Sequence, residues 1–316
     1  MHYLLSHNSA LQFWRRVQAK EALAKKRLRL KKAPVQLPDS RAFLEKRSAQ
    51  LTLPIHVLVG SRNARKATKN LHCHVCSEEL PGGSFIEVGR GLLVSSPELC
   101  FLQMASEYSL TALVKLGYEF CGGYRLGNNE DVTRGFRDDL PLTNVAKLNS
   151  YIQRAPAIKG KKKACRALQF IAEGSASPME TKLTILLTLP YRLGGYGLPM
   201  PLLNHFLAIQ GSPTGRSKKR AYRCDLFWSK QKVAVEYDSE AYHAHTVQMT
   251  KDALRRNDLI AAGITVVVAT KMQVMEAPSL RELAELLGKL LNKRMKYLSK
   301  EFPARHAELR SSILSE

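Results

Sequence analysis

The sequence predicts a mixed α/β (α+β) fold with more than one domain, and three observations predict it. The chain has 316 residues, a length that suits about two domains and allows a sizeable buried core. Its composition is ordinary for a globular protein, with 45% hydrophobic and 24% charged residues. Strand-like alternation is interleaved with capped helical segments along the chain. We therefore expect a C-terminal mixed sheet flanked by helices, preceded by a smaller α+β N-terminal domain.

The first half of the chain suggests a basic helical segment followed by a small domain. Residues 1–50 are rich in Lys and Arg, and we expect them to form a helical segment that contacts DNA. Alternating apolar residues predict strands, the last two joined as a hairpin, over 55–59, 71–75, 85–88 and 92–94. Ser95, Ser96 and Pro97 then begin a helix, because Ser caps free N–H groups and Pro suits the first turn. Residues 51–130 are interpreted as a targeting or regulatory α+β domain.

The second half begins after a polar, turn-rich stretch. We place a domain boundary near 125–145 and interpret residues 131–174 as a linker with one helix. A helix capped by Ser177 opens the next domain. The strands and helices that follow it are expected at 222–228, 232–237, 246–262 and 264–269. Residues 175–296 therefore form the predicted second domain, and residues 297–316 a C-terminal tail.

Charge gives the first indication of a partner. The chain carries 49 Lys plus Arg against 27 Asp plus Glu, a formal net charge of +22. Such a surplus attracts polyanions, either nucleic acid or an anionic membrane surface. Nucleic acid is favoured over a membrane or a merely solvated basic surface, because residues 11–32 lack the clean apolar stripe of a membrane-surface helix. Two basic clusters are the candidate nucleic-acid contacts: Lys161, Lys162, Lys163, Lys218, Lys219 and Arg220.

Other features of the composition indicate a reducing compartment. No apolar run approaches the roughly 18–20 residues that a membrane span needs. The N-terminal residues lack the apolar core of a signal peptide. Six cysteines spread over 316 residues do not form a disulfide framework. We therefore expect a cytoplasmic protein with no membrane partner.

The stretch 222–238, YRCDLFWSKQKVAVEYD, carries the most informative chemical pattern. Both of its ends have strand composition, and a tight hairpin would pair Trp228 with Val233. The same register sets Asp225 directly opposite Glu236. Facing carboxylates repel each other unless a bound divalent cation reverses the sign of the interaction. The plain alternative is two solvated carboxylates on an edge hairpin, and a one-residue slip would separate them.

Further polar residues follow the hairpin in order. His243 and His245 come shortly after the second strand, and Asp252 and Arg255 recur at helical spacing. This order predicts an α/β layer with carboxylates and imidazole on one face. An intrahelical ion pair explains Asp252 with Arg255 equally well, and a surface position explains His245.

Taken together, these motifs resemble one nuclease family. In chain order they are Glu180 on a capped helix, Asp225, the VAVEYDSEAYH segment and Asp252-x-x-Arg255-x-x-x-Leu259-x-x-x-Gly263. The set covers about residues 175–295. It is similar to the Vsr-like endonuclease domains, relatives of the very-short-patch repair endonuclease within the PD-(D/E)XK superfamily. The resemblance implies a restriction-endonuclease-like mixed sheet flanked by helices and Mg²⁺-dependent phosphodiester cleavage, with Mn²⁺ as a substitute.

The resemblance also implies a role for each residue. Asp225 and Glu236 would hold Mg²⁺, and Glu180 would orient a metal-bound water or a second ion. His243 would act as the base or position the water, and Asp252 would stabilise or orient that imidazole. Because Mg²⁺ favours one or two carboxylates plus waters and phosphate oxygens, this set suits the ion.

Two further residues are open at this point. Many members of the wider superfamily carry Lys two residues after the second acid, where this chain has Asp238, but Vsr-type relatives use His instead of that Lys. Asp238 is either a further ligand or the partner of Arg223, which the hairpin register sets opposite it. Arg255 is an additional candidate for the site.

The N-terminal half shows a looser likeness. The segments LLSHNSAL and SSPEL are similar to the antitoxin component of type IV abortive-infection systems. That family combines a DNA-binding winged-helix element with a second small domain, so the likeness implies a half that binds DNA or docks a partner. The HCHVC run at 72–76 lacks the second pair that a CxxC zinc site needs, and ordinary strand packing is favoured over structural zinc.

The first hypothesis is therefore a Mg²⁺-dependent DNA endonuclease whose N-terminal half binds or regulates, used in defence against foreign DNA such as phage or as a toxin. One alternative is a DNA-binding regulator on a nuclease-derived fold that no longer cuts. Another is an RNA nuclease. Double-stranded DNA is the expected partner, and a homodimer would supply the two active sites that cleavage of both strands requires.

Overall fold

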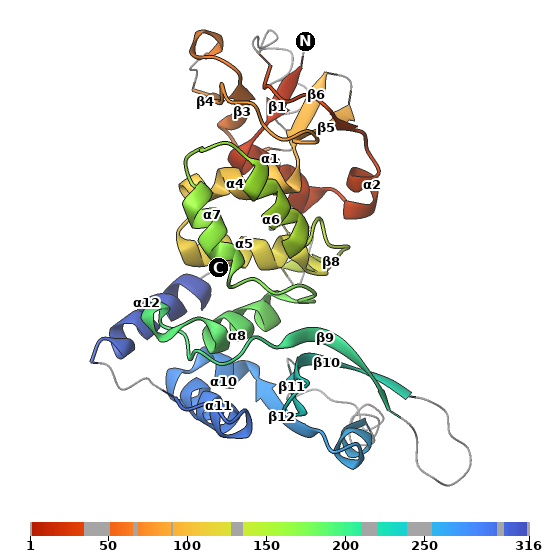
Figure 1. Cartoon of the computed structure of the whole chain (residues 1–316), viewed down its shortest axis with the longest axis vertical. Coiled ribbons are helices and arrows are strands. Elements are labelled where there is room, and N and C mark those ends of the chain that lie inside the picture. The colour runs from red at the N-terminus through yellow and green to blue at the C-terminus, as the bar shows by residue number, and fades with distance from the viewer. Residues whose placement is uncertain are drawn as a thin grey trace. The chain divides into compact units, whose positions relative to one another are not determined.

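The computed structural model describes residues 2–34, 51–65, 69–89, 91–127, 135–209, 220–238, 255–295 and 300–314. The chain divides into two compact units, Met1–Ile171 (unit 1) and Ala172–Glu316 (unit 2). Each unit combines helices with a mixed sheet, so the predicted mixed α/β class is confirmed (Figure 1). None of the helices in these stretches has both the length and the apolar character that crossing a bilayer requires.

Unit 1 is built on a six-stranded sheet with the order β2-β5-β6-β1-β3-β4. Its strands are β1 (Tyr3–Leu5), β2 (Arg27–Leu28), β3 (Ile55–Val59), β4 (Leu71–Val75), β5 (Phe85–Gly89) and β6 (Leu92–Ser95). β1 pairs in parallel with β6 and antiparallel with β3, while β3 and β4 are parallel. The predicted β5–β6 hairpin is confirmed. A separate two-stranded sheet is formed by β7 (Tyr124–Leu126) and β8 (Phe136–Asp138).

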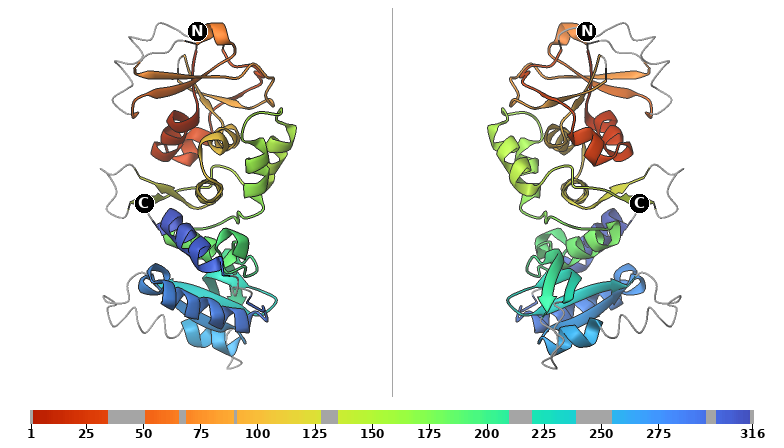
Figure 2. Two further views of the ribbon diagram at one scale, coloured as in Figure 1. Left: turned by 90° about the vertical axis from the view of Figure 1, so that its left-hand side faces the viewer. Right: turned by 90° about the vertical axis from the view of Figure 1, so that its right-hand side faces the viewer.

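The helices of unit 1 lie on one side of its six-stranded sheet (Figure 2). They are α1 (His7–Arg16), α2 (Ala19–Leu23), α4 (Pro97–Glu107), α5 (Leu110–Cys121), α6 (Val145–Arg154) and α7 (Lys161–Leu168), with a 3₁₀ turn η2 (Arg62–Ala64) outside this set. The predicted start of α4 is confirmed, because the Ser96 side chain accepts a hydrogen bond from Leu99 N and Pro97 occupies the first turn.

The prediction that residues 1–50 form a separate helical segment is wrong for the described part of that range. All three residues of β1 are buried, and the strand lies inside the sheet between β6 and β3. The expected helix over 11–32 is instead α1, α2 and the short edge strand β2. The cause is the apolar run Tyr3-Leu4-Leu5, which is buried more completely as a central strand than a basic helix would allow.

The boundary expected near 125–145 lies later, after Ile171. α6 and α7 pack against α4 and α5, so residues 131–174 are not a linker. Gly160 shows how close this packing is: its φ is +92°, and a Cβ there would lie 2.8 Å from the backbone of Ala105 and Ser106. Glycine alone adopts that backbone without strain and leaves room for α4.

Unit 2 contains a four-stranded mixed sheet with the order β12-β11-β10-β9. The strands are β9 (Leu202–Ile209), β10 (Arg220–Trp228), β11 (Val233–Asp238) and β12 (Thr265–Thr270). β10 pairs antiparallel with β9 and β11, whereas β11 and β12 are parallel. Helical residues 255–261 precede β12 and cover the sheet with Leu259, which packs with Cys224, Phe227, Ala234 and Ile264.

The remaining helices of unit 2 are α8 (Pro178–Thr188), η3 (Tyr191–Leu193), α10 (Lys271–Met275), α11 (Ala277–Leu290) and α12 (Phe302–Leu314). α8 begins as predicted, with Ser177 as its cap. The expectation that 297–316 is a tail is wrong for 302–314, because α12 packs against α8 and η3. His306 of α12 is buried and lies 2.7 Å from Gly194 O through its Nδ1.

Candidate functional site

The β10–β11 hairpin has the register that the sequence predicts. Trp228 pairs with Val233 and Leu226 pairs with Val235, and the next position of this ladder sets Asp225 opposite Glu236. Asp225 Oδ2 also accepts a hydrogen bond of 2.8 Å from Tyr237 N, on the far side of Glu236. Asp225 therefore lies within β10 between the buried Cys224 and Leu226, and Glu236 follows the buried residues Val233 to Val235 of β11.

A guanidinium lies beside the second carboxylate. Arg255 Nη2 is 3.0 Å from Glu236 Oε1, and the exposed fractions of the two side chains are 31% and 19%. The same nitrogen donates to Arg223 O. Arg255 therefore compensates the negative charge of Glu236 in this structure, where the sequence suggested a metal ion or a bond within one helix.

The third acid, Glu180, is buried at the start of α8, with only 7% of its surface exposed. Its Oε1 accepts from Ser177 Oγ at 3.0 Å, and its Oε2 accepts from Ala176 N at 2.9 Å. Ser177 Oγ in turn accepts from Glu180 N, so the two residues cap the helix reciprocally. A carboxylate held by this many donors is fixed in orientation, and it has a structural role at the helix start as well.

Electrostatics places Glu180 and Asp225 in one site. Burial raises the pKa of Glu180 above its ordinary value, and the nearby Asp225 carboxylate adds to that rise. Burial likewise raises the pKa of Asp225, against the hydrogen bond from Tyr237 N and the charges of Arg255 and Arg223. Raised carboxylate pKa values in one cluster are typical of sites that bind a cation or move a proton.

The structure adds Asn204, a residue that the sequence did not single out. It lies in β9 between the pairs Cys224–His205 and Leu226–Leu203, which puts it opposite Asp225. Its Nδ2 donates to Glu180 Oε2 at 2.6 Å and to Gly174 O at 2.9 Å. Among the described atoms its Oδ1 is buried and has no hydrogen-bond partner. Asn204 therefore connects the Glu180 helix to the Asp225 strand and leaves one acceptor unused.

The backbone of Asn204 explains why a polar residue occurs inside an apolar strand. Its φ is +48°, in the left-handed region, which Asn tolerates better than most residues other than glycine. The only sequence signal was an Asn within LLNHFLAI, and that signal is too weak to predict a role. A left-handed residue that interrupts a strand beside carboxylates is typical of a functional position.

Several predicted site residues lie outside the described stretches. They are His243, Asp252, Lys218 and Lys219, together with the side chain of Arg220 at the start of β10. Asp238 is described: it ends β11 with an exposed side chain and pairs along the backbone with Thr270 of β12. The structure thus brings together Glu180, Asp225, Glu236 and Arg255 from the predicted set.

Two lysines of the predicted nucleic-acid cluster in unit 1 make hydrogen bonds within the unit. Lys163 Nζ donates to Tyr108 O at 2.6 Å, at the C-terminus of α4. Lys161 Nζ donates to Ala155 O, at the C-terminus of α6. Both lysines therefore cap helices of their own unit. Only Lys162 of the three has an exposed side chain that is available to a polyanion.

The described residues suit a hard cation only in part. No three His, Cys, Asp or Glu side chains among them are already arranged around one metal position. Asp225 and Glu236 nevertheless supply two carboxylates, and Asn204 Oδ1 is a buried oxygen acceptor without a partner. Mg²⁺ needs one or two such carboxylates and takes its other oxygens from water and phosphate. The donor set therefore fits Mg²⁺, provided that the ion displaces Arg255 from Glu236.

Comparison with known proteins adds nothing to this geometry. The chain matches no family model, no curated protein and no solved structure. Its function must therefore be argued from its own residues.

Proposed function

We propose that this protein is a Mg²⁺-dependent endonuclease that hydrolyses DNA phosphodiester bonds at the Asp225–Glu236 site of unit 2. The observation that carries the proposal is the hairpin register, which when extended by one position sets Asp225 opposite Glu236, together with the hydrogen bond from Tyr237 N to Asp225 Oδ2. Such a pair is unfavourable without a cation, and natural sequences normally avoid it. The buried Glu180 nearby adds a third acid to the same site.

Each described residue has a role in this proposal. Asp225 and Glu236 hold the ion, which when bound polarises the scissile phosphate and lowers the pKa of an attacking water. Asn204 fixes Glu180 through its Nδ2 and offers Oδ1 to a water in the site. Arg255, released from Glu236, is free to donate its planar fork to phosphate oxygens.

The substrate class rests on charge. A net charge of +22 attracts a phosphate backbone regardless of its sequence. Double-stranded DNA is the substrate we propose, and RNA is tested beside it because no described contact distinguishes the two.

A specific observation also favours a second function, a nucleic-acid-binding module that does not cut. Arg255 already neutralises Glu236, and the described residues contain no ready-made group of three metal ligands. A stable ion pair in place of a metal ion is what an inactive relative of a nuclease would show.

The test is cleavage of supercoiled plasmid by the full chain with Mg²⁺, Mn²⁺ or EDTA. The variant Asp225→Asn/Glu236→Gln keeps the shape of both side chains and removes their charge. Glu282→Gln, an exposed carboxylate of α11, is the matched control. We expect nicked or linear product that requires metal, survives in the control and falls at least 100-fold in the double variant.

Three outcomes would count against the proposal. Cleavage that persists in the double variant would show that the site lies elsewhere. Absence of cleavage, with DNA binding that falls as salt rises, would favour the binding module. Cleavage of RNA alone would change the substrate class. Linear product would also call for a measurement of mass by light scattering, because cutting both strands suits a dimer.

A further inference from the structure

A cluster of histidines in unit 1 has no part in the proposed nuclease site. The cluster consists of His56 on β3, His72 and His74 on β4, and His7 at the start of α1. These are four of the nine histidines in the chain. His72 and His74 are two residues apart on one strand and so share a face, and His56 pairs with His72 across the parallel ladder.

The three strand imidazoles form a nearly regular triangle. Their ring centroids are 5.0 Å apart for His56–His72, 5.1 Å for His56–His74 and 4.6 Å for His72–His74. His56 Nδ1 lies 2.9 Å from His74 Nε2. Three cationic rings would repel each other strongly at these distances, so the arrangement requires neutral imidazoles or a shared ion.

These distances are close to those around a tetrahedral metal ion. Zinc–nitrogen bonds of about 2.0–2.1 Å place two ligand nitrogens about 3.3 Å apart and their ring centroids about 5 Å apart. The observed nitrogen separation needs to open by only a few tenths of an ångström to admit the ion. As placed, no three His, Cys, Asp or Glu side chains among the described residues could hold a metal ion, so binding requires the three rings to move toward one position.

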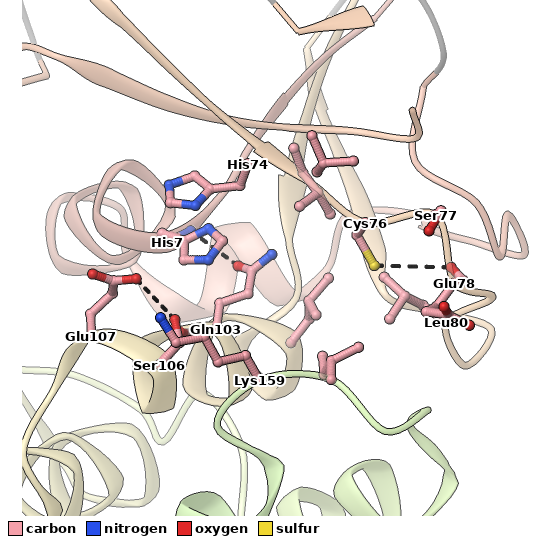
Figure 3. A pocket seen from close by; sticks show the side chains of 14 residues that line it. His7, His74, Cys76, Ser77, Glu78, Leu80, Gln103, Ser106, Glu107 and Lys159 are labelled. Atoms are coloured by element: carbon pink, nitrogen blue, oxygen red, sulfur yellow. Dashed lines mark hydrogen bonds between the residues drawn. The ribbon is translucent and has the colours of Figure 1, made fainter. Parts of the chain in front are cut away.

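The imidazole of His7 packs against that of His74 and fixes its position. Its imidazole stacks on that of His74 with centroids 3.4 Å apart and an angle of 12° between the planes (Figure 3). His7 N donates to Gln103 Oε1 at 3.0 Å, and its Nδ1 lies 3.1 Å from Ser6 Oγ. The backbone of His7 has a φ of +46°, so these contacts fix it in an unusual conformation. Orientation of ligands by a second layer of contacts is a common feature of metal sites.

We propose that His56, His72 and His74 bind one divalent transition-metal ion, Zn²⁺, in unit 1. Imidazole is a preferred ligand of Zn²⁺, and three histidines leave a fourth position for water. Binding would replace the hydrogen bond between His56 and His74 by two metal–nitrogen bonds. The ring that donates that hydrogen bond would transfer its proton, through solvent, from the ligating nitrogen to its other nitrogen.

A pocket borders the cluster at His74 and His7. It has a volume of about 400 Å³ and is lined by His7, His74, Cys76, Gln103 and Glu107, among others (Figure 3). Within the described structure the buried Gln103 Nε2 has no hydrogen-bond partner. The Cys76 thiol also lines the pocket, but burial raises its pKa and so opposes the thiolate form.

The test is a calorimetric titration of the metal-free full chain with Zn²⁺, in excess Mg²⁺ so that the carboxylate site of unit 2 does not interfere. We expect one Zn²⁺ per chain in wild type. The variant Asp225→Asn/Glu236→Gln should bind Zn²⁺ as wild type does, whatever the result of the cleavage assay. The control His2→Asn changes an exposed histidine outside the cluster and should also leave affinity unchanged.

The variant His72→Asn is the decisive one, because this side chain is exposed and its loss leaves the core intact. We expect at least a 100-fold loss of Zn²⁺ affinity in it, and loss of the rise in thermal midpoint that Zn²⁺ causes in wild type. Circular dichroism of the metal-free variant verifies its fold. Absence of saturable Zn²⁺ binding in wild type, or unchanged affinity in His72→Asn, would overturn the proposal. A tenfold loss in Cys76→Ser would overturn the three-histidine ligand set.

Discussion

Replacing Arg255 by Met tests whether this arginine competes with a cation for Glu236. The substitution removes the guanidinium charge and keeps an unbranched apolar stem. Because the Arg255 Nη2–Glu236 Oε1 distance is 3.0 Å, the two unit charges interact by about 1.4 kcal/mol even at the dielectric constant of water. Both side chains are partly exposed, so solvent screens the ion pair. The value for water therefore applies, and not the larger value for a dry protein interior.

A cation that takes Glu236 must first displace Arg255, and the variant removes that cost. A free energy of about 1.4 kcal/mol corresponds to a tenfold change in affinity. We therefore expect Arg255→Met to bind Mn²⁺ about tenfold more tightly than wild type, measured by electron paramagnetic resonance of the free ion. If the guanidinium also contacts phosphate, the cleavage rate at saturating metal falls in the same variant.

Two controls make the Mn²⁺ measurement specific. Arg256→Met changes the exposed neighbouring arginine and should leave Mn²⁺ affinity as it is in wild type. In an Asp225→Asn background the gain from Arg255→Met should disappear, because the site then lacks its other carboxylate. Unchanged or weaker Mn²⁺ binding in Arg255→Met itself would refute the reasoning, since Glu236 would then not be a ligand.

Three further predictions follow from contacts in both units. Glycine accepts the φ of +48° at position 204 and alanine does not. The free energy of unfolding, measured with urea, should therefore be about 1 kcal/mol higher for Asn204→Gly than for Asn204→Ala. Equal stability of the two variants would contradict this account. Glu98 is buried, and although burial opposes its charge, the hydrogen bonds and charge of Arg27 and a bond from Thr143 hold its pKa below the ordinary value. Its stabilisation is therefore complete above about pH 4.3 and is lost as the pH falls through the lowered pKa. Glu98→Gln should lower the free energy of unfolding by about 2 kcal/mol at pH 7 and make that free energy less dependent on pH in the acid range. An unchanged free energy of unfolding at pH 7 would show that the ion pair does not stabilise the fold. Lys163→Gln should cost about 1 kcal/mol of stability through the lost bond to Tyr108 O and leave the salt dependence of DNA binding unchanged. An altered salt slope would show that Lys163 contacts phosphate.

The sequence was sufficient for elements whose signals are local. Ser96 and Ser177 allowed the starts of two helices to be predicted. Each serine accepts a hydrogen bond from the N–H group three residues later, so the signal is local in the sequence. The β10–β11 hairpin, in which Trp228 pairs with Val233, was also predictable, since a short turn and alternating side chains determine its register.

The remaining features depend on contacts between distant segments. Tyr3-Leu4-Leu5 was not recognised as a strand because its partners come from β3 and β6, far along the chain. Asn204 was missed because its role depends on Glu180, a residue of another element. The bond from Lys163 to the carbonyl of Tyr108 was not predicted, because these two residues are 55 positions apart in the sequence.

The histidine cluster illustrates the same point in a different way. The strand predicted over 71–75, which contains most of the HCHVC run, is confirmed as β4. A metal site was not predicted here, because the run lacks a second cysteine pair. The other imidazoles of the cluster come from His56 and His7, which lie on other elements. Spacing rules detect ligands that are close in sequence, and this group is assembled only by the parallel pairing of β3 with β4.

The central place of β1 has a consequence for how quickly each unit folds. Leu5 pairs with Val94, so the two halves of the unit 1 sheet cannot join until a long loop has closed. Closing such a loop costs entropy before any contact offsets it, and parallel pairing between distant segments is slow for that reason. The β10–β11 hairpin of unit 2 needs only a short turn, and hairpins of this kind form in about 1–10 μs. We therefore expect closure of the unit 1 sheet through β1 to be slower than formation of the β10–β11 hairpin.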